Sequence, residues 1–184
     1  MFRIYQQSIA SGVIYETGEL SPWDFKNVCS IALKLGEYDW TGQFISGNEH
    51  RIAAEFRGSA IAYNRANLYF HQKRFDLALR SLSQVEYSDV FYALDTRRIM
   101  LIIYYERGDA EAFFSLITSF RAYLARNKAV SQQHQQSYKN FIDWAARLFR
   151  LLPAELKERR DALRAELEAT EPVTDRPWLL GLLT

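Results

Sequence analysis

The sequence has few of the residues that break helices or cross-link a chain. Its 184 residues include 8 glycines, 4 prolines and a single cysteine, Cys29. So few glycines and prolines in a chain of this length favour long helices over many short strands joined by turns. One cysteine excludes an intramolecular disulfide, which is typical of a protein from a reducing compartment.

Long apolar runs are also missing. No stretch approaches the roughly 20 consecutive apolar residues that a membrane-spanning helix needs. The first residues, Met1–Gln7, lack the apolar run and the small-residue cleavage site of a signal peptide. We therefore expect a cytoplasmic protein without a membrane partner.

An excess of charge of either sign is absent too. Lys and Arg number 23 and Asp and Glu number 22, so the formal net charge is +1. Nucleic-acid-binding proteins usually carry a basic excess, because phosphate neutralisation supplies much of their affinity. RNA binding by a helical repeat is an alternative, but the sequence has no recurring pair of base-reading side chains. We expect no nucleic-acid partner.

What the sequence does have is aromatic residues, 12 Phe, 11 Tyr and 4 Trp, and apolar residues at helical spacing along most of its length. Such spacing predicts amphipathic helices. Ser21, Pro22 and Asp24 together form a strong helix start, with a side-chain cap and a proline in the first turn. We expect about eight or nine helices, near residues 2–16, 22–34, 39–46, 55–71, 75–85, 90–106, 110–126, 131–151 and 154–169.

The expected helices pair into hairpins with a regular period. Tyr38, Phe75 and Ala110 each follow a turn and begin the second helix of a pair, at intervals of 37 and 35 residues. Two helices in a period of about 34 residues are typical of a helical solenoid. A solenoid of antiparallel hairpins is therefore the predicted architecture.

The clearest unit, residues 62–79, resembles a tetratricopeptide repeat. Ala66 and Tyr69 stand where that family has a small and an aromatic residue in the first helix of its hairpin. Phe75 and Ala78 stand at the aromatic and small positions of the second helix. Small residues allow the two helices to approach closely, and aromatic residues fill the space where the next hairpin stacks.

The neighbouring hairpins keep part of this pattern. Cys29 and Tyr38 fit the first hairpin, where Thr41 replaces the second alanine, and Tyr104 fits the third. The resemblance covers about residues 21–169 and implies an all-α, right-handed solenoid of antiparallel helical hairpins. We expect one repeat domain over residues 1–170, followed by an extended tail over 171–184 with an apolar end, because prolines and the residues before them resist helix.

No residues form a recognised catalytic or metal-binding pattern. His50, His71 and His134 are not spaced as metal ligands, and the sequence has no Gly-rich phosphate loop or nucleophile elbow. Cys29 shares a helix face with Val28, so a buried apolar role is expected for its side chain. We therefore expect no enzyme activity, no cofactor and no metal site.

The resemblance also implies where a partner would bind. In proteins similar to this family, the first helix of each hairpin lines a concave groove that binds a peptide or a helix. Lys and Asn side chains at such positions are suited to a peptide's terminal carboxylate, although they are also ordinary solvated or interhelical polar groups. Carried over to this sequence, the groove residues are Lys26, Tyr63, Asn64, Asn67, Phe70, His71, Arg98 and Tyr105. We expect a non-catalytic scaffold that binds a protein or peptide.

The tryptophans suggest an alternative function. Trp23, Trp40 and Trp144 fit positions in the core between stacked helices, whereas Trp178 lies beyond the last expected helix. Its side chain either folds back over the last hairpin, which limits aggregation, or anchors another chain. In the second case the protein is a structural or regulatory subunit that assembles, with itself or with a larger complex, through its first helix or its tail.

Overall fold

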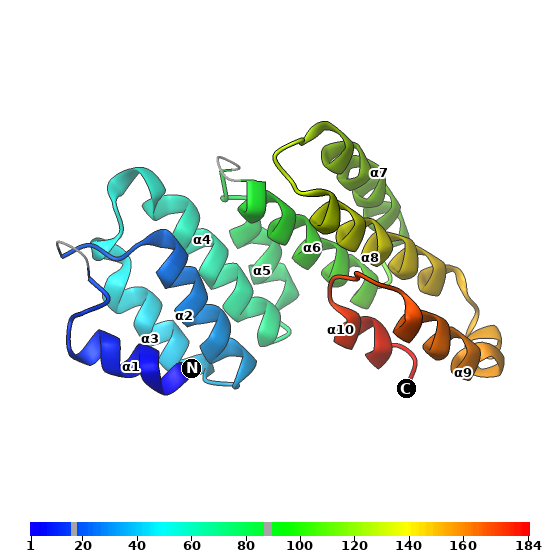
Figure 1. Cartoon of the computed structure of the whole chain (residues 1–184), viewed down its shortest axis with the longest axis horizontal. Coiled ribbons are helices and arrows are strands. Elements are labelled where there is room, and N and C mark those ends of the chain that lie inside the picture. Colours follow the sequence, from blue (N-terminus) through cyan, green and yellow to red (C-terminus); the bar gives the residue numbers. More distant parts are fainter. Residues whose placement is uncertain (16–17, 87–89) are drawn as a thin grey trace. The chain divides into compact units, whose positions relative to one another are not determined.

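The computed structural model of the chain describes residues 1–15, 18–86 and 90–184, apart from the side chain of Phe91. Within these ranges the chain forms ten α-helices and one short 3-10 helix, and no strand (Figure 1). The all-α prediction is confirmed. In the same ranges, no helix is both long enough and apolar enough to cross a membrane.

The helices follow the expected order, with one addition at the C-terminus. They are α1 (Phe2–Ala10), α2 (Pro22–Lys34), α3 (Tyr38–Asn48), α4 (Ala54–His71), α5 (Phe75–Leu82), α6 (Val90–Glu106), α7 (Ala110–Arg126), α8 (Gln132–Arg150), α9 (Pro153–Ala169) and α10 (Arg176–Gly181), with the 3-10 helix at Glu49–Arg51. The first helix ends earlier than predicted, because Gly12 adopts a left-handed backbone with φ 75°. Residue 16, its predicted end, lies outside the described residues.

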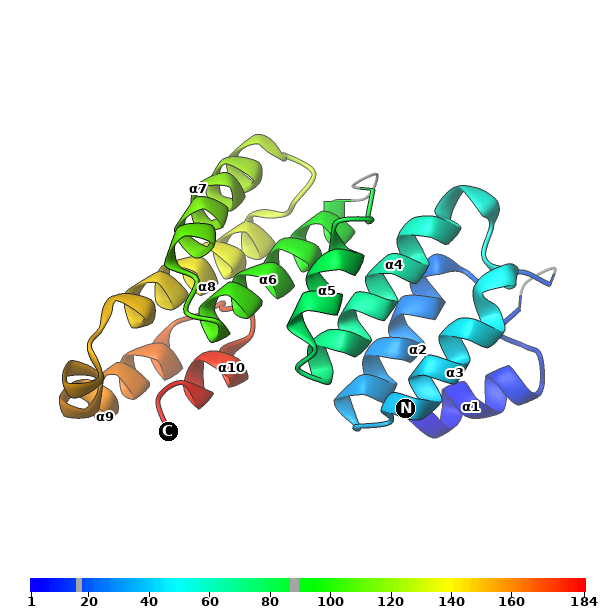
Figure 2. The same cartoon turned by 180° about the vertical axis from the view of Figure 1, so that it is seen from behind.

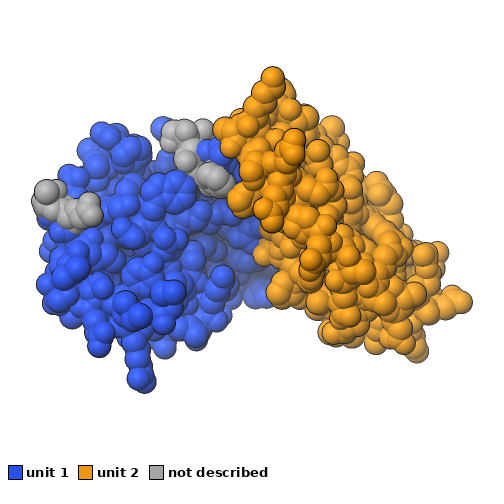
Figure 3. Space-filling view, viewed as in Figure 1, with its two compact units in different colours: residues 1–100 blue, residues 101–184 orange. Residues whose placement is uncertain are grey.

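The chain divides into two compact units, which we describe separately. Unit 1 is Met1–Met100 and unit 2 is Leu101–Thr184, so the boundary falls within α6 (Figure 3). The sequence predicted one domain over 1–170 and a separate tail. The structure corrects both bounds, since residues 171–184 belong to the second unit.

In unit 1, α2 contacts α1, α3 and α4, and α4 also contacts α3 and α5 (Figures 1 and 2). Phe25, Val28 and Cys29 of α2 are fully buried in the core of this unit. Ala66 of α4 and Ala78 of α5 are also fully buried. Small side chains at these two positions allow α4 and α5 to approach closely, which is the role expected from the repeat pattern.

In unit 2, α7 contacts α8, and α10 contacts both α8 and α9. The sequence predicted that the C-terminal segment is extended throughout. The structure corrects this prediction, because Arg176–Gly181 forms α10. Pro177 lies in the first turn of this helix, where the missing backbone N–H of proline removes no hydrogen bond. Leu179 and Leu183 are buried, so the segment contributes to the core of unit 2.

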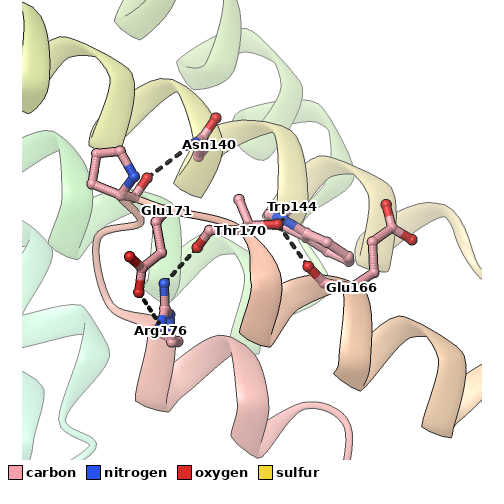
Figure 4. A network of polar contacts seen from close by, with 7 residues as sticks. Asn140, Trp144, Glu166, Thr170, Glu171 and Arg176 are labelled. Carbon is pink, nitrogen blue, oxygen red and sulfur yellow. Dashed lines mark hydrogen bonds and ion pairs between the residues drawn. The ribbon is translucent and has the colours of Figure 1, made fainter.

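Polar contacts attach the segment before α10 to α8 and α9 (Figure 4). The indole Nε1 of Trp144 donates to Oγ1 of Thr170 at 3.2 Å, and Nδ2 of Asn140 donates to the carbonyl of Pro172 at 2.7 Å. Arg176 donates back to the carbonyl of Thr170 at 2.5 Å. The Arg176 bond satisfies the carbonyl of the residue that ends α9, and the three bonds together fix the path of the chain into α10.

Candidate functional site

The predicted groove residues do not form one open surface. Tyr63, Asn64 and Asn67 of α4 are 1%, 0% and 5% exposed. Their helix is covered by α2, α3 and α5. Buried side chains offer no surface to a partner, so their assignment to an open groove is wrong. Nδ2 of Asn64 donates to the carbonyl of Ala60 in its own helix, at 2.8 Å.

Lys26 is bound inside unit 1. Its Nζ lies 2.5 Å from Oδ2 of Asp95 in α6. Three rings surround the ammonium, with centroids 5.0 Å away for Tyr92, 5.2 Å for Tyr63 and 5.6 Å for Trp23. Ring faces attract a cation through their quadrupoles, most strongly where water is excluded. The chain itself therefore supplies both the anion and the aromatic contacts of Lys26.

Asp95 collects further partners. Arg98 Nε lies 3.6 Å from Oδ1 of Asp95, and the hydroxyl of Tyr63 lies 3.3 Å from Oδ2. Burial by itself would raise the pKa of Asp95, but the charges of Arg98 and Lys26, with hydrogen bonds from Lys26 and Tyr63, outweigh it and lower the pKa. Burial and the neighbouring Asp95 charge raise the pKa of Tyr63 well above its usual range. These residues hold a carboxylate, as the groove hypothesis required, but it is a carboxylate of the chain itself.

The other predicted groove residues lie in two different places. Phe70 and His71 are half-buried at the C-terminal end of α4, where the His71 ring lies 6.5 Å from Tyr38 and 5.6 Å from Phe70. Tyr105 lies in unit 2, with its ring against that of Trp178 at 5.1 Å. Burial, followed by the charge of the neighbouring Glu106, raises the pKa of Tyr105 to about 12.

Trp178 packs within unit 2. Besides Tyr105, its ring contacts Phe141 of α8 at 5.9 Å, and its Nε1 donates to Oε1 of Glu106 at 2.9 Å. The tail therefore folds back on its own unit, which is one of the two arrangements that the sequence left open for Trp178. Its largest aromatic group is already in contact and is not presented to another chain.

An open groove does exist in unit 1, at the N-terminal ends of α2 and α4. It consists of two adjoining cavities of about 600 Å³ and about 590 Å³. Pro22, Glu55 and Phe56 line both cavities, so the two share a wall. Trp23 and Phe56 are 44% and 45% exposed there, which is unusual for side chains of their size. We call these two cavities together the acidic groove.

The charge of this groove is one-sided. Four carboxylates line it, those of Glu19, Asp24, Glu55 and Glu86. No Lys, Arg or His occurs among its described lining residues, and within the described parts of the chain none of the four carboxylates makes an ion pair. Like charges collected on a concave surface produce a negative potential that attracts cations.

Sequence reasoning missed this groove. It assigned Trp23 to the core and Asp24 to helix capping, and it did not single out Phe56. The available signal was an acidic residue beside an aromatic residue in the first turn of two successive hairpins, Trp23-Asp24 and Glu55-Phe56.

The described residues give little support for a metal site or for a reactive cysteine. In them, no group of three or more His, Cys, Asp or Glu side chains is arranged to hold a metal ion. Cys29 is fully buried, as expected, and burial raises the pKa of its thiol. No protein-family model, curated protein or solved structure matches this chain.

Proposed function

We propose that this chain is a non-catalytic scaffold of tetratricopeptide-like hairpins, and that it binds a segment of another protein in the acidic groove of unit 1. The observation that carries the proposal is the exposure of Trp23 and Phe56, which both line an open cavity of about 600 Å³. Large aromatic side chains contribute most to the stability of protein interfaces when a partner covers them. Leaving them in water without a partner favours aggregation.

The size of the groove agrees with a peptide occupant. Cavities of about 300–1,000 Å³ are typical of specific binding sites, and each half of the groove falls in this range. Two adjoining cavities provide room for successive side chains of one segment. The first turns of α2 and α4 contribute Pro22, Trp23, Asp24, Glu55 and Phe56 to the lining, and α1 and the connecting segments contribute most of the rest.

The lining residues support binding more than catalysis. Among those that the structure describes, no Cys, His or Lys is present to act as a nucleophile or as its base. Oγ of Ser59 accepts a hydrogen bond from the backbone N–H of Glu86 at 3.0 Å, which is a structural contact. Apolar rings and separated carboxylates are groups that recognise a ligand.

A pull-down from the source cell's lysate tests the proposal. Phe56→Ala removes the ring that both cavities share. Leu35→Ala removes an exposed apolar side chain at the C-terminal end of α2, about 20 Å along the helix from Pro22 in the groove. We expect a protein that is recovered with wild type and with Leu35→Ala and is lost with Phe56→Ala. Recovery of the same proteins with all three forms, or of none, contradicts binding in this groove.

Self-assembly through the first helix is a second candidate function, and one observation supports it. Met1 and Ile4 are 78% and 60% exposed, so apolar side chains lie on the outer face of α1 beside the exposed Arg3 and Gln7. If the protein assembles through this face, the molar mass measured by sedimentation rises with protein concentration. In the variant Ile4→Glu it stays at the monomer value. A monomer at every concentration contradicts it. The tail is a poorer candidate, because Trp178 contacts its own unit.

A further inference from the structure

We propose that the segment bound in the acidic groove is basic and amphipathic, with apolar side chains on Trp23 and Phe56 and a Lys or Arg between the rings and the carboxylates of Glu55 and Glu86. This inference rests on the proposed function and adds the chemistry of the partner. It follows from the charge of the groove and from the way that the same rings already bind a cation.

Charge is the first argument. The groove presents four carboxylates and, among its described lining residues, no cationic side chain. An acidic peptide or a nucleic acid would meet a surface of its own sign, and such juxtaposition is strongly unfavourable. A basic segment gains attraction at each of these carboxylates and is also steered toward the groove before contact.

The second argument is the combination of rings with carboxylates. In the larger cavity Trp23, Phe56 and Tyr92 lie with Glu55 and Glu86. An ammonium or guanidinium group binds best where a ring face and an anion are both within reach, because the ring compensates for lost water and the anion for the charge. No Lys or Arg occurs among the described lining residues of this cavity to pair with Glu55 or Glu86.

The chain uses the same chemistry next to the groove. Trp23 and Tyr92, two of the groove's rings, also contact the ammonium of Lys26, whose anion is Asp95. Lys26 shares Asp95 with Arg98, and neither of these two cations is among the described lining residues of the groove. Glu55 and Glu86 line the same cavity as Trp23 and Tyr92, and neither carboxylate makes an ion pair within the described parts of the chain.

A displayed library of random peptides, about twelve residues long, tests the inference on the full chain. Wild type and Phe56→Ala are immobilised in parallel, and circular dichroism first verifies that both are equally helical. We expect peptides that prefer wild type over Phe56→Ala and that combine Lys or Arg with bulky apolar residues. Peptides that prefer wild type but lack a basic excess would overturn the inference and leave the proposed function standing. No preference for wild type would overturn both.

The most enriched peptide then serves as the probe in fluorescence anisotropy. Glu55→Gln with Glu86→Gln removes two groove charges and keeps the shape of both side chains. The control, Glu158→Gln with Asp161→Asn, removes two charges from exposed positions of α9 in unit 2. We expect the groove variant to weaken binding about five- to thirtyfold and the control to change it less than about twofold. Equal affinities, or equal losses in the two variants, would overturn the inference.

Discussion

The ammonium of Lys26 lies 2.5 Å from Oδ2 of Asp95, although 69 residues separate the two in sequence. The pair joins α2 to the N-terminal part of α6 within unit 1. Only 13% of the Lys26 side chain and 22% of the Asp95 side chain are exposed. Water therefore cannot easily replace either partner, and removing one leaves the other charge poorly solvated.

We expect Asp95→Asn to lower the free energy of unfolding by about 1–3 kcal/mol, because it removes the anion of a largely buried lysine. Urea denaturation monitored by circular dichroism measures the change. The matched control is Asp143→Asn. The side chain of Asp143 is 62% exposed and that of its ion-pair partner Arg121 is 52% exposed, so this pair contributes less than about 1 kcal/mol to stability. Equal effects of the two substitutions would contradict a special role for the Lys26–Asp95 pair.

The titration of Asp95 should make the free energy of unfolding depend on pH. The pKa of Asp95 is lowered in the folded chain, whereas an unfolded aspartate titrates near about 3.9. The contribution of Asp95 is therefore complete above about pH 4 and is lost as the pH falls through the lowered pKa. Unfolding free energies of wild type and Asp95→Asn should differ at about pH 6 and converge toward about pH 2. A difference that stays constant over this range would contradict the assignment.

Most helices could be predicted from local signals, because periodicity and capping act within a few residues. The bounds of α6 and α7 agree with prediction, and Oγ of Ser21 caps α2 by accepting from the N–H of Trp23 at 3.2 Å. The missed helix, α10, shows the limit of such rules. Proline resists helix and so predicts an extended chain at Pro177, but proline also fits a first helical turn. The burial of Leu179 in unit 2 favours the helix.

The site was harder to predict, because exposure depends on neighbours that are distant in sequence. The repeat pattern placed Asn64 and Asn67 on the first helix of a hairpin but gave no information on which helices cover them. It assigned Lys26 and Arg98 to one groove, yet the carboxylate that they share, Asp95, carried no local sign of that role. Trp23 looked like a core residue, and only the fold leaves it 44% exposed.

The attachment of the C-terminal segment gives a prediction for unit 2. We expect Thr170→Val to lower the free energy of unfolding by about 1–3 kcal/mol, because the indole N–H of Trp144, a residue only 6% exposed, loses its acceptor. Thr170→Ser keeps the hydroxyl and should cost less than about 1 kcal/mol. Thermal unfolding of both variants measures the difference. If Ser and Val are equally destabilising, the hydrogen bond is not what stabilises this segment.

Site-specific photo-crosslinking tests the central claim, that the acidic groove of unit 1 binds another protein, most directly. A benzophenone amino acid replaces Phe56, which lines both cavities, or Leu35, which is exposed at the far end of α2. We predict a discrete covalent adduct with a partner protein from position 56 and none from position 35 after irradiation in the source cell. No adduct from position 56, or the same adducts from both positions, would contradict the claim.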